Sequence, residues 1–178
     1  GKGKGKGGGA PAGKAAPTVA ALDIRVGKIL SAEHHPGADS LYVEQIDVGE
    51  GEPRTIVSGL RKFVPLEQLQ GRPCVVLCNL KPAKMRDVLS NGMVLCAGND
   101  AHTEVDPLRP PEGAVPGERF ACAGFEGEPE AVLAPKKKIF EKVAADLLTN
   151  DKGEACYKGV PLLTPQGPAT STLHGVHV

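Results

Sequence analysis

Short apolar runs, separated by glycine and proline, limit what this chain can fold into. In its first hundred residues these runs are five to nine residues long and lie at 22–30, 41–48, 54–58, 72–80 and 93–97. Runs of this length that end at turn residues are typical of strands, because helices need longer amphipathic stretches. In the first run, apolar residues alternate with Asp23 and Arg25, as in a strand with one buried face. The pattern predicts a mainly β fold, either a small barrel or a sandwich.

The region after residue 123 has a different pattern. Pro135 begins the one clear helical segment, at 135–148, in which Ile139, Val143 and Leu147 recur every four residues. Three consecutive lysines at the start of this segment oppose the helix dipole, which makes them a candidate cation cluster. A last strand is expected at 157–163. A subdomain of about fifty residues is too small to bury the apolar stripe alone, so we expect it to pack against the first half.

The charges of the chain are unevenly spread. Its 21 Lys and Arg balance 21 Asp and Glu, yet from Arg54 to Arg86 seven cations stand against one acid, a charge of +6. Residues 1–18 hold four lysines, no acid and no large apolar side chain, so we expect a disordered tail or linker there. A polyanion binder needs a locally positive field, whatever its total charge. The distribution therefore suits a nucleic-acid partner.

Several classes of protein are disfavoured by what the sequence lacks. No apolar run reaches 18 residues and none follows the first lysines, so we expect neither a membrane span nor a secretory signal. Five cysteines, an odd number in mostly apolar runs, are typical of reduced core thiols in a cytoplasmic protein. We expect no metal site, because Cys74 and Cys78 have no Cys or His pair at ligand spacing. His34 and His35 lie in a Pro-Gly turn and are interpreted as surface turn residues.

The stretch from Asn79 to Met93 carries the strongest functional signal. It joins two apolar runs that have the length of buried strands. Between the runs lie three cations within six positions, Lys81, Lys84 and Arg86. Buried strands hold such a loop rigidly, and binding groups are commonly placed on loops of this kind. The residues alone allow two interpretations, an anion-binding platform and an ordinary solvated connection between strands.

Several motifs resemble a known family. They are LDIRVGKI at 22–29, HPGADSLYVEQIDV at 35–48, RTIVSGL at 54–60, LCNLKPAKMR at 77–86, SNGM at 90–93, PKKKIF at 135–140 and YKGVP at 157–161. Together they resemble the tRNA-binding domain shared by endothelial monocyte-activating polypeptide II, a yeast synthetase cofactor and C-terminal extensions of some tyrosyl- and methionyl-tRNA synthetases. The resemblance covers essentially residues 21–163.

The resemblance implies a five-stranded oligonucleotide-binding (OB) barrel with a small appended α+β subdomain. On that basis we divide the chain into a Lys/Gly-rich tail or linker at 1–18, an OB-fold tRNA-binding domain at 19–123 and a C-terminal subdomain at 124–178. In relatives that have such a subdomain it packs where a second subunit would sit, which implies a monomeric pseudo-dimer. The implied function is non-catalytic. The module would deliver or retain tRNA for an aminoacyl-tRNA synthetase in cis or in trans, largely independently of tRNA sequence.

The family's tRNA contacts, carried over onto matching positions, predict the binding site. They fall on Asn79, Lys81, Lys84, Met85, Arg86, Ser90 and Met93, and further candidates are Arg25, Lys28 and Ser58. Lysine and arginine can neutralise phosphates, while Asn79 and Ser90 can hydrogen-bond a phosphate, a ribose hydroxyl or a base edge. Met85 offers a soft apolar surface, although either methionine could equally belong to the core. Since aromatic residues make up 3% of the chain, we expect base stacking to be minor.

Three other functions fit parts of the sequence. Residues 24–30 resemble a segment associated with cytokine activity in a mammalian relative, so a secreted cytokine-like polypeptide released from a synthetase-complex protein is the main alternative. The same residues have the pattern of a core strand. A chaperone-like barrel, as in one bacterial branch, is disfavoured by the second half of the chain.

An enzyme is disfavoured on chemical grounds. Lys84, Met85 and Ser90 superficially resemble the Lys-Met-Ser loop of class I synthetases, but the His-x-Gly-His element and the nucleotide-binding fold that such a loop requires are missing. No Ser/His/Asp set or carboxylate pair stands out either. We therefore expect no catalytic residues and no cofactor. The expected partners are tRNA and a synthetase, in the cytoplasm.

Overall fold

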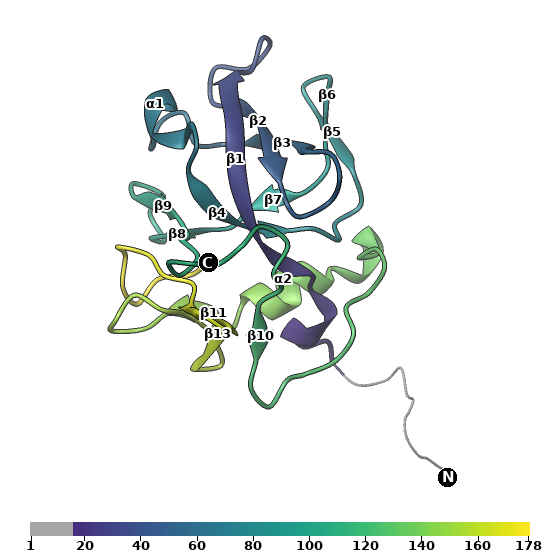
Figure 1. Ribbon diagram of the computed structural model, residues 1–178, viewed down its shortest axis with the longest axis vertical. Coiled ribbons are helices and arrows are strands. Elements are labelled where there is room, and N and C mark those ends of the chain that lie inside the picture. Colours follow the sequence, from purple (N-terminus) through teal and green to yellow (C-terminus); the bar gives the residue numbers. More distant parts are fainter. Residues whose placement is uncertain (1–15) are drawn as a thin grey trace.

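The first half of the chain forms a five-stranded antiparallel sheet in the computed structural model, which describes residues 16–178 (Figure 1). Its strands are β1 (Ile24–His34), β2 (Tyr42–Asp47), β3 (Arg54–Ser58), β4 (Pro73–Leu77) and β7 (Met93–Val94), in the order β3-β2-β1-β4-β7. Each of the five predicted runs corresponds to one of these strands, although β1 continues four residues past the run at 22–30, so the mainly β prediction is confirmed. The tail expected at 1–18 lies largely outside the described residues.

The sheet curls into a nearly closed barrel. Strand β1 is 11 residues long and pairs with β4 through its first half and with β2 through its second. A bulge between Ile29 and Ser31 shifts the pairing and bends the strand, which is a common device for closing barrels. The open edge of β3 is closed by the Asn91 N–H, which donates to the Thr55 carbonyl at 2.8 Å. This arrangement is the expected OB-type barrel.

Two hydrophobic clusters lie on opposite faces of β1 and β4, because successive side chains along a strand point to opposite faces. The barrel interior contains Ile29 and Val76, packed with residues of β2 and β3. The outer cluster contains Ile24 and Leu77 together with Val143 and other residues of the second half. The two halves of the chain therefore share one of the two cores. The predicted division at residue 123 stays a prediction.

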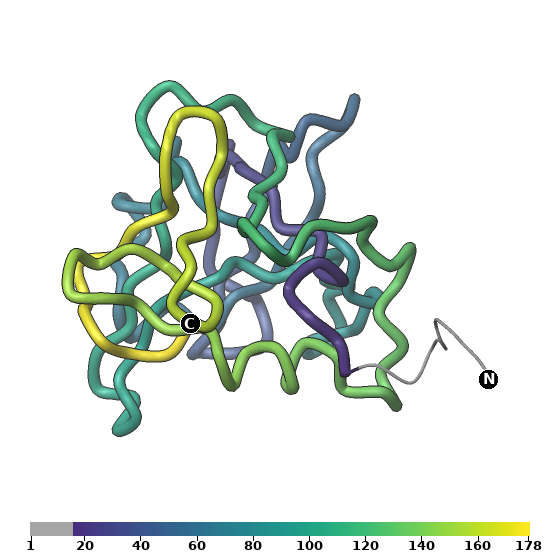
Figure 2. Tube along the Cα trace, turned by 90° about the horizontal axis from the view of Figure 1, so that it is seen from below, coloured from purple at the N-terminus to yellow at the C-terminus, as the bar shows by residue number. Residues whose placement is uncertain are grey.

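The second half gathers at one end of the barrel, as the green and yellow segments of Figures 1 and 2 show. A small antiparallel sheet forms its centre, in the order β10 (Ala121–Cys122), β13 (Val160–Thr164), β12 (Ala155–Tyr157) and β11 (Leu147–Thr149), with β14 (Gly167–Pro168) beside β13. The remaining elements of residues 16–178 are η1 (Val19–Ala21), α1 (Leu66–Leu69), β5 (Ala83–Met85), β6 (Val88–Ser90), β8 (Cys96–Gly98), β9 (Val105–Pro107), η2 (Pro135–Lys137) and α2 (Ile139–Ala144). Among the described residues no helix is long and apolar enough to cross a membrane.

The single helix predicted at 135–148 is wrong in extent. The structure has a 3-10 turn, η2, then Lys138 in the left-handed region at φ 51°, then the six residues of α2. The apolar stripe is nevertheless buried, since Ile139, Val143 and Leu147 all belong to the shared core. Leu147 lies in strand β11 because it pairs with Tyr157 of β12, and such tertiary pairing outweighs weak helix propensity.

Candidate nucleic-acid interface

The predicted cationic loop forms a hairpin that projects from the barrel. Strands β5 and β6 pair in the register Ala83↔Ser90, Lys84↔Leu89 and Met85↔Val88, and the hairpin stands at the upper right of Figure 1. We call residues 81–90 the cationic hairpin. Lys81, Lys84 and Arg86 are all exposed on it. The hairpin therefore presents positive charge to solvent on a short scaffold.

The tip of the cationic hairpin has a strained backbone. Arg86 and Asp87 are the two residues between the paired Met85 and Val88, and both have positive φ values, 51° and 74°. Two-residue hairpin turns with positive φ at both positions strongly favour Asn-Gly. A residue with a Cβ costs of order 1 kcal/mol in this region. Contacts elsewhere have to stabilise this turn.

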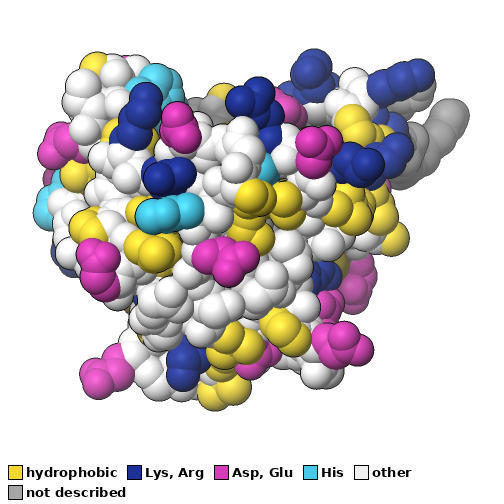
Figure 3. All heavy atoms as spheres, turned by 90° about the horizontal axis from the view of Figure 1, so that it is seen from above, with side chains coloured by type: hydrophobic (Ala, Val, Ile, Leu, Met, Phe, Trp, Pro, Cys, Tyr) yellow, Lys and Arg dark blue, Asp and Glu magenta, His cyan; other side chains and the backbone are white. Residues whose placement is uncertain are grey.

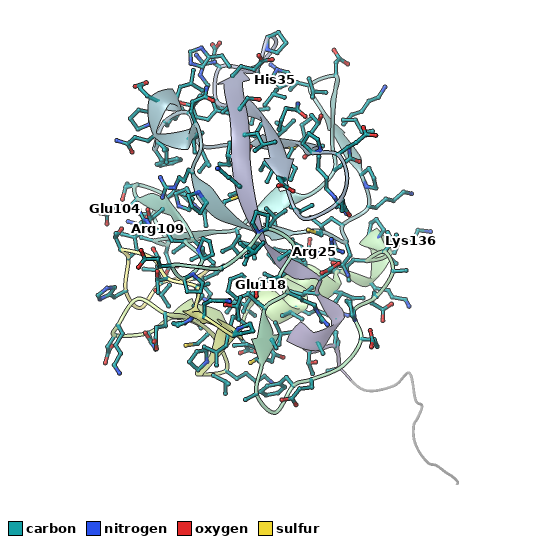
Figure 4. The ribbon with its side chains drawn as sticks, in the orientation of Figure 1. Arg25, His35, Glu104, Arg109, Glu118 and Lys136 are labelled. Atoms are coloured by element: carbon teal, nitrogen blue, oxygen red, sulfur yellow. The ribbon has the colours of Figure 1, made fainter. Side chains whose placement is uncertain are left out.

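His35, in the loop that follows β1, supplies one such contact. Its ring is buried, with 4% of its surface exposed, and its Nε2 lies 2.8 Å from the Met85 carbonyl oxygen. The Gly37 N–H donates to Nδ1 at 2.9 Å, so we assign the proton to Nε2, which donates to Met85. Figure 4 shows His35 beside the far end of β1. His35 thus joins the β1–β2 loop to the tip of the cationic hairpin.

The interpretation of His35 as a surface turn residue is therefore wrong, whereas its neighbour His34 is exposed as predicted. The turn itself is present, since Gly37 donates to the His35 ring within it. Met85, whose carbonyl oxygen accepts from the His35 ring, lies 50 positions away in the sequence. Local turn chemistry carries no signal of such a distant contact, so neither motif nor spacing could have placed this residue.

Three of the predicted contact residues are buried and form hydrogen bonds within the protein. The Asn79 amide oxygen accepts from the Asp23 N–H at 3.1 Å, and its Nδ2 donates to the carbonyls of Ala21 and Glu130 at 2.9 and 2.8 Å. The Ser90 hydroxyl accepts from the Val57 N–H at 2.9 Å and donates to the Gly92 carbonyl at 3.1 Å. Ser90 thereby helps to close the barrel against β3. Asn79 and Ser90 hold the loop that presents the cations.

The third, Ser58, is coupled to a buried carboxyl group. Its hydroxyl donates to Oε2 of Glu44 at 2.8 Å, while Oε1 of Glu44 has no hydrogen-bond partner among the described residues. Glu44 points into the barrel and is fully buried. Burial raises the pKa of Glu44 to about 7, although the hydrogen bond from Ser58 opposes this shift. Apolar runs and turn residues carry no signal for a buried glutamate, since glutamate is almost never fully buried.

The two candidates on β1 lie outside the cationic hairpin. Arg25 donates to both carboxylate oxygens of Asp23, at 3.1 and 2.9 Å, and these hydrogen bonds raise its pKa. Its remaining hydrogen bonds go to Val48 and Glu50. Lys28 is exposed, opposite Asp47 of β2 and Pro73 of β4. The structure does not bring Arg25 or Lys28 to the cationic hairpin.

Three arginines of the +6 window have partners within the protein. Arg54 forms two hydrogen bonds to Glu50, at 2.8 and 2.7 Å, and also donates to two backbone carbonyls. Arg72 lies 3.7 Å from Asp106, and Arg61 donates to the Ala38 carbonyl. The other four cations form no ion pair among residues 16–178, and they are Lys62, Lys81, Lys84 and Arg86. Three of these four lie on the cationic hairpin.

The second half brings further lysines to this side of the molecule. The Leu133 N–H donates to the Asn79 carbonyl at 2.8 Å, which sets the chain before η2 beside the start of the hairpin. A groove of about 350 Å³ between the two is lined by both Lys81 and Lys138. Lys136, on η2, is labelled at the right of Figure 4, and Figure 3 shows Lys and Arg side chains gathered at the upper right of the face seen from above. The candidate cation cluster at 136–138 therefore adjoins the hairpin.

A hollow lies between the cationic hairpin and the barrel. Its volume is about 250 Å³, and its lining comes from β3, the hairpin and β7. We call it the hairpin hollow. Five of the ten predicted contact residues line it, and they are Ser58, Lys81, Met85, Ser90 and Met93. The structure thus brings together around one hollow residues that are up to 35 positions apart in the sequence.

The cysteines agree with the prediction of reduced thiols. All five are free, and four of them are buried. Burial raises the pKa of the Cys78 thiol to about 11, so it stays protonated at neutral pH. Among residues 16–178 no group of three His, Cys, Asp or Glu side chains could hold a metal ion.

A family model described as "Putative tRNA binding domain" matches residues 24–119 of the chain. The matched segment contains the five barrel strands and the cationic hairpin. It covers more than half of the 178 residues. The OB-type barrel and the predicted contact residues therefore lie inside the matched region.

Three curated proteins illustrate the relationship. The chain is 59% identical over 150 residues to a "Probable methionine--tRNA ligase" of Oryza sativa subsp. japonica, covering 84% of this chain and 19% of that protein. It is 57% identical over 140 residues to aminoacyl tRNA synthase complex-interacting multifunctional protein 1 of Mus musculus, covering 79% and 44%. It is 55% identical over 157 residues to the cytoplasmic tyrosine–tRNA ligase of Xenopus laevis, covering 86% and 30%. The chain spans less than half the length of each.

Solved structures extend the comparison to both halves of the chain. The C-terminal domain of Plasmodium vivax p43 superposes with a TM-score of 0.85 at 34% identity, covering 90% of this chain and 98% of that one. A MetRS-related protein from Pyrococcus horikoshii superposes with a TM-score of 0.52 at 33% identity, covering 55% of this chain and 88% of that one. Sequence match, fold and structural likeness agree, and the chain belongs to the tRNA-binding domain family.

Proposed function

We propose that this module binds tRNA through the cationic hairpin and the adjoining lysines of the second half, without catalysing a reaction. The observation that carries the proposal is the set of exposed cations, Lys81, Lys84 and Arg86, which form no ion pair among the described residues. Backbone phosphates are the natural counterions for such a set. Phosphate contacts carry no sequence information, so binding is largely independent of tRNA sequence.

The partner of this module is an aminoacyl-tRNA synthetase. Two of the relatives are named as tRNA ligases and one as a synthase complex-interacting protein, which supports a synthetase partner in cis or in trans. The module would deliver or retain tRNA for that enzyme in the cytoplasm, where the name of the tyrosine–tRNA ligase places that relative. Its second half covers the face of the barrel where a second subunit would otherwise sit, so that one chain forms a monomeric pseudo-dimer.

The position of residues 24–30 in the fold argues against the cytokine-like alternative. Ile24, Val26 and Ile29 of this segment are 2%, 1% and 0% exposed, and all three lie in the two cores. A receptor could reach these side chains only after the barrel had unfolded. The segment is explained by its role as a core strand.

The salt dependence of tRNA binding tests the proposal. With about four to six phosphates contacted, log affinity should fall against log salt with a slope of about −3 to −5. Fluorescence anisotropy of a labelled tRNA between about 50 and 200 mM salt measures it. Lys84→Ala should weaken binding and reduce the slope by about 0.7–0.9. Lys62→Ala is the matched control, because Lys62 is exposed and unpaired in the same window but lies outside the hairpin. A flat salt dependence would refute the proposal.

A further inference from the structure

The hairpin hollow contains more apolar surface than phosphate binding requires. Its lining includes Val57, Leu80, Met85, Met93 and Val94, beside two serines and one lysine. Met85 is 37% exposed, so its thioether is available to a ligand. Exposed apolar surface surrounded by polar groups usually marks a contact site. A ligand for this hollow therefore has an apolar face.

We propose that the hairpin hollow binds one unstacked nucleobase of the tRNA, an inference that rests on the proposed function. Nucleobases combine flat apolar faces with polar edges, and RNA-binding proteins commonly bind bases splayed out from single-stranded loops and ends. The hollow contains about 250 Å³, which is below the roughly 300–1,000 Å³ of sites for drug-sized ligands. That size suits a single ring system. The lining residues include no aromatic ring, so methionine and aliphatic groups contact the face of the base.

The two serine hydroxyls of the hollow already form hydrogen bonds within the protein. The Ser58 hydroxyl donates its proton to Glu44 in a buried hydrogen bond, and the Ser90 hydroxyl bonds Val57 and Gly92. The apolar side chains of the lining therefore provide most of the contact with a base, which keeps binding largely independent of the identity of that base.

The cations around the hollow are placed to hold the backbone of the same nucleotide. Lys81 lines the hollow itself. Lys84 directly precedes Met85 on β5, and the two side chains point to opposite faces of the hairpin. A base inserted in the hollow leaves its phosphate outside, where Lys81 can neutralise it. Charge complementarity therefore favours a nucleotide over an uncharged apolar ligand.

A substitution that fills the hollow tests this proposal. Gly59 lines it, and a Cβ added there would meet only Leu41 Cδ2, at 3.9 Å, an ordinary contact. Gly59→Leu should weaken tRNA binding by about tenfold, the effect of losing one base contact, and should leave the salt slope unchanged. Gly51→Leu is the matched control, because nothing lies within 4 Å of a Cβ there and Gly51 is outside the hollow. A fully paired RNA duplex should bind wild type and Gly59→Leu equally.

Each outcome separates this proposal from the broader one. If tRNA binds the wild-type protein with the expected salt slope but Gly59→Leu binds equally well, the base-binding proposal is overturned and the proposed function stands. If Gly59→Leu weakens tRNA and duplex alike, the leucine acts on the phosphate surface and the base-binding proposal is again overturned. Met85→Ala is a second test. Because Met85 is exposed, the substitution should leave the fold intact, and it should weaken tRNA binding at an unchanged salt slope.

Discussion

Short polar side chains, rather than charges, hold the binding loop in place. Asn79 satisfies three backbone groups and Ser90 two, and His35 satisfies one backbone group on each side of its ring. Leaving such a buried group unpaired costs about 1–3 kcal/mol. Motif resemblance predicted Asn79 and Ser90 as tRNA contacts, and that role stays a prediction, whereas the structure shows both side chains supporting the cationic hairpin. Their burial could not be predicted, because asparagine and serine occur both in binding sites and in turns and caps.

The buried carboxyl group of Glu44 predicts a specific pH dependence of stability. Its pKa is about 7 in the folded protein against an ordinary value of 4.5, so between these values the folded state binds one more proton than the unfolded state. The contribution of Glu44 to the free energy of unfolding should therefore be largest below pH 4.5, fall by roughly 3 kcal/mol as the pH rises through 7, and stay constant above about pH 8.

Glu44→Gln should remove this dependence. Urea unfolding at pH 5 and pH 8 should show the variant gaining stability relative to wild type at the higher pH. Glu33→Gln, an exposed carboxyl on β1, is the control and should follow wild type at both values. If wild type and Glu44→Gln lose stability in parallel, Glu44 is ionised in the folded barrel.

At the scale of elements, the cationic hairpin depends on the rest of the barrel. Its strands have three residues each, and an isolated two-stranded hairpin is marginal in water. The five barrel strands were predictable from their apolar runs. The two short strands of the hairpin were not predictable, because residues 83–90 lack apolar alternation and have Arg-Asp where Asn-Gly is usual. The length of the helix at 135–148 was overestimated. Apolar residues that recur every four positions do not show where the chain leaves the helix and pairs with a neighbouring strand.

His35 should therefore act on tRNA binding through the hairpin, without touching RNA. His35→Ala should weaken binding by roughly three- to tenfold, equivalent to one net hydrogen bond, and His35→Gln, which keeps an N–H donor, should restore part of it. His34→Ala is the matched control, since His34 is adjacent and exposed.

A double-mutant cycle with Arg86→Ala distinguishes positioning from general stability. If His35 positions the hairpin tip, the losses from His35→Ala and Arg86→Ala should be clearly less than additive in anisotropy titrations. Fully additive losses, together with a lowered melting temperature for His35→Ala, would show that His35 only stabilises the barrel.

At the scale of the whole molecule, the two halves form one hydrophobic unit. The outer face of the barrel contributes Ile24, Val26, Val75 and Leu77 to the core that the second half covers. The need for such a partner was predictable from the apolar stripe of residues 139–147. The contacts that place the second half against the hairpin were not predictable from the sequence. They are made by backbone groups, such as the Leu133 N–H, which every residue type except proline carries.

Removing the second half should therefore change the assembly state. A chain that stops after Ala123 exposes this apolar face and should dimerise or aggregate, whereas the intact chain should be monomeric. Light scattering on both proteins measures this. A soluble monomeric truncation, or an intact chain that forms a tight dimer, would contradict the pseudo-dimer and leave tRNA binding untouched.

The amide of Asn79 also has a consequence for how the protein is made. Its Nδ2 needs the Glu130 carbonyl, which emerges from the ribosome 51 residues later. At about 5–20 residues per second, that delay is roughly 3–10 s. During this interval the barrel strands are already synthesised, but the end of β4 lacks its last acceptor. A nascent chain therefore holds Asn79 only through Asp23 and Ala21 until residue 130 has emerged, so the loop after β4 gains its full set of hydrogen bonds late in synthesis.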